Sequence, residues 1–326
     1  MAVNLSRRTV VTAKSESAYG TDPTPTLADD ALLVFGDGAA VFTQNITVVD
    51  QPALRASLTP QQALIGKSMA TVNLGTVLMT ASKASDTAGE TSSRPFYADL
   101  LKACGLTEAI GTDGSSSSTV YTPVTDDPTS ATVYVYADNQ LHKVKGCYGS
   151  YTLTMNAGAQ PDLQFNLQGL YEAPTASGGT SGVVYPTDDK TLVENELITI
   201  GSFTPKVRSL TLNWATTMAE RNDANADKGF CGFYLTERAP TLNVVIEEDD
   251  IGTYNPWGDL YAAPSDSIVF THATSATEKI LLTVTNPQLT NIARSSDAGL
   301  NTLSLDFRLW SNTDEGEMSL VFKKQA

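Results

Sequence analysis

The sequence has few of the residues that enzyme and metal sites most often use. It contains two histidines, His142 and His272, and three cysteines, Cys104, Cys147 and Cys231. An odd number of widely spaced cysteines argues against a disulfide framework or a zinc site, so we expect buried free thiols in a reducing cytosol. The histidines are far apart, and a catalytic base needs an orienting partner, so we expect ordinary surface or turn residues.

Several motifs are also missing from the chain. It has no GxSxG elbow, no HExxH and no glycine-rich phosphate loop, so no common hydrolase or nucleotide site is indicated. No segment approaches the roughly 18 to 20 apolar residues of a membrane span. The N-terminus MAVNLSRRTVVTAKSES has two arginines but no apolar core. We therefore expect neither export by a standard signal nor insertion into a membrane.

Positive charge is scarce as well. The net charge is -15, with 10 Lys+Arg against 15 Asp+Glu in residues 1–170 and 11 against 21 in residues 171–326. Tight nucleic-acid binding depends on basic residues that neutralise phosphates, so this balance argues against it. The charge is compatible with a surface that DNA passes without sticking. Apolar residues make up 41% of the 326 residues, which is enough for a large buried core.

Two acidic stretches and three tryptophans could form a binding site. EEDD (residues 247–250) and ERNDANADKG (residues 220–229) hold the oxygens that calcium prefers, but neither alternates ligands with turn residues as hard-cation loops do. A solvated strand end and a long polar loop are the favoured interpretations. Trp214, Trp257 and Trp310 lie where a strand or helix presents a core face, so we expect core packing rather than a carbohydrate platform.

What the sequence does have is alternation of apolar and polar residues with a period of two. This pattern, bounded by Gly, Pro, Asn, Asp and Ser, is typical of half-buried antiparallel strands. The clearest predicted strands are residues 131–138, 148–158, 162–171, 207–217, 278–286 and 301–311. Helices are predicted only for RPFYADLLKACG (residues 94–105), with a terminal glycine suited to a left-handed cap, and more weakly for NPWGDLYAAP (residues 255–264).

The two predicted helices indicate an internal repeat. Residues 96–100 align with residues 256–260, and residues 72–74 align with residues 242–244; residues 163–170 align with residues 303–310. The order strand, loop, strand, helix, strands is thus written twice. We predict a first module over residues 1–178, with a Ser/Thr-rich insertion at 111–130, and a second module over residues 183–326. The linker APTASGGTSG (residues 173–182) joins them.

Two blocks of the chain resemble tail tube proteins of long-tailed bacteriophages and prophages. The first is AKSESAYGTDPTPTLADDALLV (residues 13–34), which is similar to their N-terminal segment. The second is residues 131–175, where a β-hairpin, the turn Gly146-Cys147-Tyr148-Gly149 and a strand ending in Gly-Leu-Tyr follow one another. The second half is similar mainly through the repeated order of its elements.

The resemblance implies a mainly β structural protein of the virion tail and not an enzyme. In this family, subunits form rings, and the rings stack into a hollow tube that conducts DNA. The implied fold is a tandem of β-sandwich tail-tube modules, each with one short flanking helix, whose strands form a closed inner β-barrel on oligomerisation. Closing the sheet through neighbours would also remove exposed strand edges. Two modules per chain predict homotrimeric rings with pseudo-sixfold symmetry.

The same resemblance implies the partners and the location. We expect contacts with other copies and with tape measure, tail terminator and distal tail proteins. We also expect transient passage of double-stranded DNA, no membrane and no cofactor, with assembly in the cytoplasm of the bacterial host. A carboxylate-lined channel would repel phosphates, and the strand-borne Asp162 and Asp306 are candidate channel acids.

The N-terminal block supplies the candidate contact residues. Read alone, it holds two turns followed by an apolar run that needs burial. We predict an arm lying along an adjacent subunit or ring, and we expect a chain without residues 1–26 to fold but to stack poorly. The candidate contact residues are Tyr19, Gly20, Asp22, Pro23, Pro25, Leu32 and Leu33.

Two alternatives to a tail tube remain open at this point. A capsid decoration protein would associate with heads and form no tubes. A carbohydrate-binding or carbohydrate-active β-sandwich would need a deep pocket with two carboxylates and a tryptophan.

Overall fold

The protein is described here by a computed structural model. It covers residues 6–35, 41–83 except 53, 58 and 60, 93–113, 116–187 except 178, 192–262 except 195, 266–273, 278–312 and 315–325. Strands dominate these residues, so the mainly β prediction is confirmed. The described strands of the single chain do not close into a barrel.

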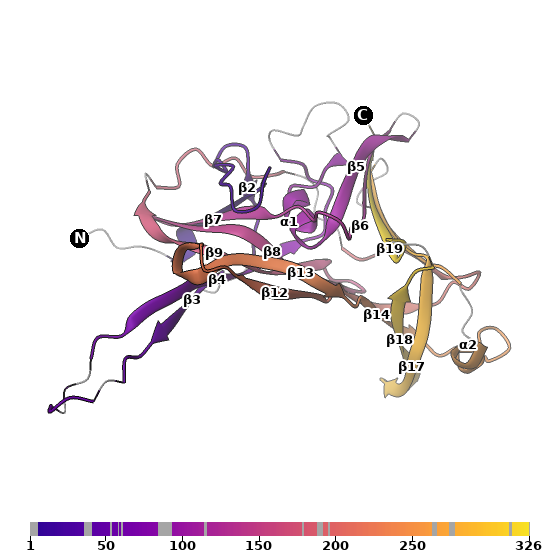
Figure 1. Ribbon diagram of the computed structural model, residues 1–326. Coiled ribbons are helices and arrows are strands. Elements are labelled where there is room, and N and C mark those ends of the chain that lie inside the picture. The colour runs from indigo at the N-terminus through magenta and orange to yellow at the C-terminus, as the bar shows by residue number, and fades with distance from the viewer. Residues whose placement is uncertain are drawn as a thin grey trace.

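The larger sheet has eleven strands and spans both halves of the chain. Its long central strand β8 pairs with β9 along one side, and on the other side with β7 at one end and β11 at the other. Figure 1 shows β3 at one extremity of this sheet and β17 at the opposite one. The strands are β1 (Thr9–Ser15), β2 (Ala31–Leu32), β3 (Phe42–Val49), β4 (Leu64–Val77), β7 (Ala131–Ala137), β8 (Gln140–Asn156), β9 (Asp162–Ala176), β11 (Val207–Asn213), β14 (Thr241–Glu247), β17 (Asn286–Asp297) and β18 (Leu300–Trp310).

The second sheet has six strands in the order β10-β15-β16-β19-β6-β5. Its members are β5 (Leu106–Asp113), β6 (Ser116–Pro123), β10 (Leu197–Ile200), β15 (Ile268–Ala273), β16 (Glu278–Val284) and β19 (Met318–Gln325). The segment predicted as a Ser/Thr-rich insertion thus contains β6, whose partner β19 is the last strand of the chain. Both sheets therefore run through both halves of the sequence.

One core joins the two sheets. Alternate residues along β8, β9, β11, β14 and β18 are buried, which is the pattern that the sequence predicted. Aromatic rings link the layers, because Phe165 of β9 and Phe322 of β19 both contact the ring of Tyr97, at centroid distances of 6.2 Å and 6.1 Å. Trp214 is buried against Tyr151 and donates its indole N–H to the carbonyl of Cys104, so its predicted core position is confirmed.

The two helices are short and lie where they were predicted. Helix α1 (Ala98–Ala103) packs on β1 and β5, and α2 (Pro256–Ala262) packs on β17. Helix α1 is shorter than its predicted range, because Tyr97 adopts a non-helical conformation at its start. Gly105 follows it with a φ of +80°, the left-handed conformation expected from the sequence.

The remaining two strands form a separate hairpin over the large sheet. The predicted strand 207–217 is divided by Ala215, which has a φ of +40°, so that the chain leaves β11 and enters β12 (Thr216–Asn222). β12 pairs with β13 (Phe230–Arg238), and both lie against β8. The polar segment 220–229 contains the turn of this hairpin, as the loop interpretation predicted.

Three sequence predictions about single residues are wrong. Trp257 and Trp310 are partly exposed rather than buried in the core. His272 is completely buried in β15, not in a surface loop, because its imidazole Nδ1 pairs with Glu196 beneath the second sheet. Period-two alternation predicts which face a residue takes, but not whether another element covers that face.

Candidate assembly surfaces and channel face

The large sheet has one apolar face on the core and one polar face. Cross-strand pairs place the polar residues of six neighbouring strands on the same side. They are Thr71, Asn73 and Gly75 of β4; Asp162, Gln164, Asn166 and Gln168 of β9; Ser150, Thr152, Thr154 and Asn156 of β8; Ser209, Thr211 and Asn213 of β11; Thr241, Asn243, Val245 and Glu247 of β14; and Thr302, Ser304, Asp306 and Arg308 of β18. Neutral amides and hydroxyls dominate this face.

Both candidate channel acids lie on this polar face. Asp162 begins β9 and accepts a hydrogen bond from the amide of Gln164 at 2.7 Å. Asp306 lies mid-strand in β18 and accepts from the side-chain amides of Asn243 at 2.5 Å and Asn291 at 2.9 Å. The structure thus brings the two residues onto one surface, while their role in a channel stays a prediction.

The two halves of this surface have the same strand registers. β4 and β9 place Asn73 opposite Asn166, and β14 and β18 place Asn243 opposite Asp306, which are residues 170 and 140 positions further along the chain. The side chains of both pairs are hydrogen-bonded to each other. These are the offsets of the sequence alignment.

The match extends along the neighbouring strands. Phe42 of β3 pairs with Val72, as Leu212 of β11 pairs with Leu242, again 170 residues later. The strand following each inner pair is the first strand of a hairpin with β9 or β18, namely β8 or β17. The strand order in the first half is β3-β4-β9-β8, and in the second it is β11-β14-β18-β17.

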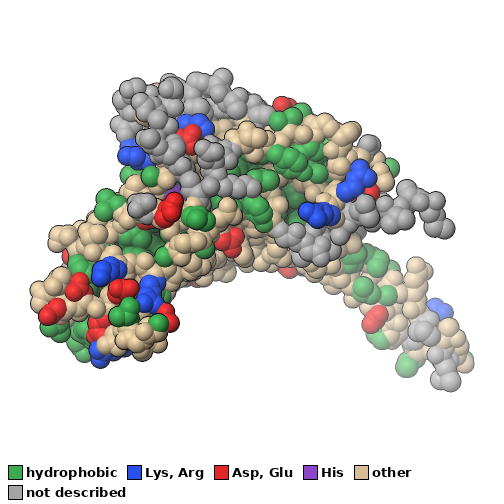
Figure 2. All heavy atoms as spheres, turned by 180° about the vertical axis from the view of Figure 1, so that it is seen from behind, with side chains coloured by type: hydrophobic (Ala, Val, Ile, Leu, Met, Phe, Trp, Pro, Cys, Tyr) green, Lys and Arg blue, Asp and Glu red, His purple; other side chains and the backbone are tan. Residues whose placement is uncertain are grey.

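The two outer strands of this run have one open side each. Within the described residues, β3 pairs only with β4 and β17 pairs only with β18. Figure 2 shows the molecule arched over a concave side, with these two ends as its feet. The β17–β18 foot mixes charges of both signs, because Arg294 binds Glu248 at 2.7 Å and Arg208 pairs with both Glu247 and Asp297.

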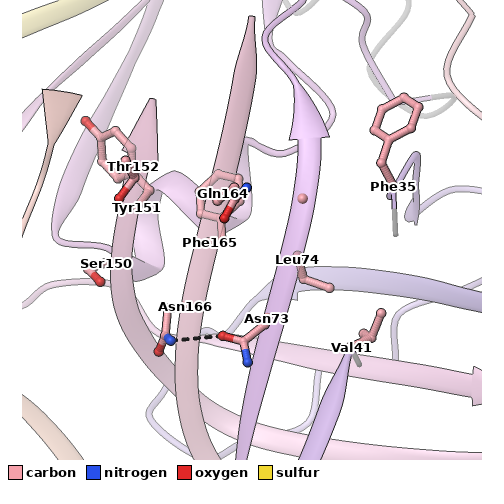
Figure 3. Close-up of a pocket in the computed structure, with 11 residues that line it drawn as sticks. Phe35, Val41, Asn73, Leu74, Ser150, Tyr151, Thr152, Gln164, Phe165 and Asn166 are labelled. Carbon is pink, nitrogen blue, oxygen red and sulfur yellow. Dashed lines mark hydrogen bonds between the residues drawn. The ribbon is translucent and has the colours of Figure 1, made fainter. Parts of the chain in front are cut away.

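A hollow of about 460 Å³ opens on the polar face beside Phe35. Figure 3 shows the Asn73–Asn166 hydrogen bond at its floor, with Ser150, Thr152 and Gln164 around it. No carboxylate or histidine lines it. Two further hollows contain glutamates but no tryptophan. None of these three hollows therefore has the carboxylate pair and tryptophan that a carbohydrate-active site requires.

The described residues offer little for other chemistry. No group of three or more His, Cys, Asp or Glu side chains within them could hold a metal ion. Cys104 and Cys147 are buried free thiols whose pKa is raised by burial, whereas Cys231 is half-buried. His142 contacts Tyr171, and burial lowers its pKa. No helix in this part of the chain is long and apolar enough to cross a membrane.

The first candidate contact residues are held by their own chain. Tyr19 donates to the carbonyl of Gly146 at 3.1 Å and accepts from the amide of Phe233 at 2.7 Å, so it ties the N-terminal segment to the β12–β13 hairpin. Gly20 has a φ of +74°, and its amide donates to the buried carboxylate of Glu16.

Glu16 was not singled out by the sequence. Its carboxylate accepts four hydrogen bonds, from the amides of Gly20 and Gly146 and from the hydroxyls of Ser130 and Thr132. A buried carboxylate is tolerated where its lone pairs are satisfied in this way. The pattern S-E-S alone gives no signal for it, because the four donors come from distant segments.

The other candidate contact residues also have partners within the chain. Asp22 accepts from Tyr134, Thr24 and Lys143; burial raises its pKa, but these hydrogen bonds hold it below its usual value. Four more residues of this set follow: Pro23 is half-buried, Pro25 is buried, Leu32 pairs with β1, and Leu33 packs against the core. Contacts between these residues and another copy stay a prediction.

The expectation for the N-terminal deletion has to be corrected. Residues 9–15 form β1, which pairs along its whole length with β7, and Val10, Val11 and Ala13 are buried. A chain without residues 1–26 would lose this strand from the large sheet. The segment is therefore part of the folded subunit, and its removal should destabilise the fold itself.

Comparison with known proteins agrees with the resemblance in sequence. A family model described as phage tail tube protein matches residues 6–309, which is nearly the whole chain. No curated protein matches the chain.

Proposed function

The chain belongs to the phage tail tube protein family, and from this we propose that it is the subunit that forms the tube itself. Copies join into rings, the rings stack, and double-stranded DNA passes through the central channel at infection. Family membership supports the coarser statement that this is a structural component of the virion tail.

The observation behind the ring is the run β3-β4-β9-β8-β11-β14-β18-β17, which has an open edge at each end. Open edges are templates for pairing with another chain. Because the two edges differ, pairing β17 of one copy with β3 of the next is a head-to-tail contact, which closes into a ring when the rotation allows it.

The matching registers support two equivalent modules per chain, and hence three chains in a ring with pseudo-sixfold symmetry. In that symmetry, the β8–β11 junction inside each chain is the template for the β17–β3 junction between chains. Thr152 of β8 lies opposite Asn213 of β11. The equivalent residues, traced through the registers of β9–β18 and β4–β14, are Ala293 of β17 and Thr43 of β3.

Two measurements test this assembly. Electron microscopy of the purified protein should show tubes, and native mass spectrometry of an isolated ring should give three chains; six chains would refute the stoichiometry. A Thr43→Cys/Ala293→Cys variant should oxidise into a closed covalent trimer, because opposed residues in antiparallel strands lie within disulfide range. Thr43→Cys/Asp297→Cys, on the same strand but out of register, is the matched control.

The polar face is proposed as the channel wall. Of the residues on it, Asp162, Glu247 and Asp306 are acidic and Arg308 is basic, so the wall is weakly acidic and mostly neutral. Without clustered cations, a duplex finds no deep binding minimum through counterion release. Tubes should not retain DNA in 50 mM salt, whereas Asn166→Lys tubes should retain it in a salt-dependent way; strong retention by the unmodified tube would refute a channel of this kind.

The remaining partners follow from the family. Tape measure, tail terminator and distal tail proteins are proposed to contact the tube at its lumen and ends, and assembly is proposed to occur in the cytoplasm of the bacterial host. Co-purification of tubes with these proteins from infected cells is the corresponding test.

A further inference from the structure

The outer part of the β3–β4 hairpin is apolar and projects from the body of the molecule (Figure 1). Val48 is 55% exposed, Leu64 is 55% exposed and Ile65 is 58% exposed. Ile46 and Val49 are also exposed. A two-stranded hairpin is marginally stable in water by itself, and a contiguous exposed apolar surface marks an interaction site.

The β12–β13 hairpin is the counterpart of this projection. Ile46 pairs with Ser68 and Val48 with Ile65; 170 residues later, Thr216 pairs with Arg238 and Met218 with Leu235. Both hairpins have a register irregularity at the same place, between the first and second of these pairs. The two hairpins therefore have the same local architecture.

Unlike the projecting hairpin, β12–β13 is covered. Met218 and Leu235 pack against a cluster formed by Tyr148, Phe230 and Phe233, which Leu170 of β9 also contacts. The cluster lies at the end of the first half of the large sheet, across the β8–β11 junction from the strand that leads into the hairpin. A hairpin of the second half thus covers the sheet of the first half.

The surface equivalent to that covered sheet is open. Leu170 has Trp310 of β18 as its counterpart 140 residues later, and Trp310 is 36% exposed although alternation predicts a core position. The sizes of the partners are exchanged: position 63, the counterpart of Phe233, is alanine, while the counterpart of Leu170 is the larger tryptophan. A small residue on the hairpin and a large one on the sheet can fill the same space.

We propose that the β3–β4 hairpin of one copy packs on the second half of the adjacent copy in the ring, with Val48 and Ile65 against Trp310. This proposal rests on the proposed ring, because the adjacent copy is the one whose β17 pairs with β3. The interface inside the chain and the interface between chains are then two versions of one contact. Within a chain the hairpin reaches back over the first half, and between chains it reaches over the neighbour's second half.

The matched variants Ile65→Asp and Leu64→Asp test this arrangement. Ile65 is the counterpart of Leu235, which is packed, whereas Leu64 is the counterpart of Tyr234, which stays 46% exposed in the covered hairpin. Both residues are exposed in the monomer, so both variants should keep the circular dichroism spectrum and the urea midpoint of the unmodified subunit. Ile65→Asp should raise the protein concentration needed for ring formation by at least about tenfold, and Leu64→Asp by less than about twofold.

A fluorescence measurement supplies a second readout. In a Trp257→Phe background, the emission of Trp310 should shift to the blue when rings form, because the hairpin removes water from the indole. Ile65→Asp should abolish this shift at concentrations where Leu64→Asp retains it.

The possible failures are distinguishable. If the unmodified protein forms no rings, the proposed function fails and this inference falls with it. If rings form but both variants assemble alike, or if Trp310 emission does not change, the ring stands and the hairpin contact is refuted. If Ile65→Asp forms rings of normal stability that fail to stack, the hairpin lies between rings, which also overturns the proposal.

Discussion

Replacing Lys83 with methionine should destabilise the subunit strongly, because its ammonium is the centre of a buried charge cluster. The side chain is 2% exposed. Its Nζ donates to the carbonyl of Ala13 at 2.7 Å, to Asp99 at 2.6 Å and to Asp30 at 3.3 Å. One cation thus joins β1, the segment before β2 and helix α1.

The size of the effect follows from the partners that remain. Breaking a buried ion pair by removing one partner costs about 3–5 kcal/mol, because the other charge is left uncompensated. Asp99 would keep Arg94 at 2.7 Å and Lys102 at 3.1 Å, but Asp30 would keep only Lys14 at 3.8 Å. Methionine preserves most of the apolar stem and removes the desolvation cost of the ammonium. We therefore expect a loss near the lower limit, about 3 kcal/mol at pH 7.

Urea unfolding of the monomeric subunit measures this loss, and Lys67→Met is the matched control. Lys67 pairs with Glu220 at 2.6 Å, but the two side chains are 27% and 41% exposed. An ion pair of that kind contributes less than about 1 kcal/mol. Equal destabilisation by the two variants would refute the reasoning, since it would mean that burial of the cluster has no energetic consequence.

The pH dependence gives the experiment its second arm. Burial raises the pKa of Asp99, but attraction to Lys83, Arg94 and Lys102 outweighs it and holds the pKa well below the usual range. A depressed folded-state pKa stabilises the protein above the unfolded value near 3.9, and this stability is lost as the pH falls further. Without Lys83 the depression is smaller, so the stability gap between wild type and variant should narrow from pH 7 to pH 3; a constant gap would contradict the mechanism.

Three further predictions test the packing around the N-terminal segment and β8. Deleting residues 1–26 removes β1, so we expect aggregation or loss of the cooperative urea transition; a soluble, cooperatively folding product would show that the strand is dispensable. Gly149→Ala should prevent folding, because its new Cβ would lie 2.1 Å from a backbone carbonyl oxygen, whereas Gly111→Ala, with open space around it, should leave thermal stability unchanged. Tyr19→Phe removes the acceptor of the Phe233 amide, so hydrogen exchange at that amide should accelerate by at least about tenfold, and unchanged protection would argue against the anchor.

The sequence predicted those features that depend on local periodicity. Alternation identified the strands and the apolar face of β9 and β18, and proline and glycine marked the two helices. The offsets of the repeat matched the pairing registers, because a register reflects which side chains face one another, and this is preserved in the alternation itself.

The features that escaped prediction depend on long-range contacts. Glu16 receives donors from segments more than a hundred residues away, and His272 is buried because Glu196 and the core surround it. Trp310 satisfies the alternation of β18, but the strand runs past the edge of the element that would cover it. The pairing of β6 with β19 joins opposite ends of the chain and leaves no local signal.

The duplication also explains why the two hairpins differ in composition. In the proposed ring, half of the six junctions lie inside chains, so only three must offset the loss of translational and rotational freedom, which costs at least about 4 kcal/mol for each association. The covalently joined hairpin has Thr216 and Ala219 where the projecting hairpin has Ile46 and Val49. Additional apolar area is needed only where no peptide bond holds the partners together. The more apolar of two otherwise matching hairpins should therefore be the one that works between molecules.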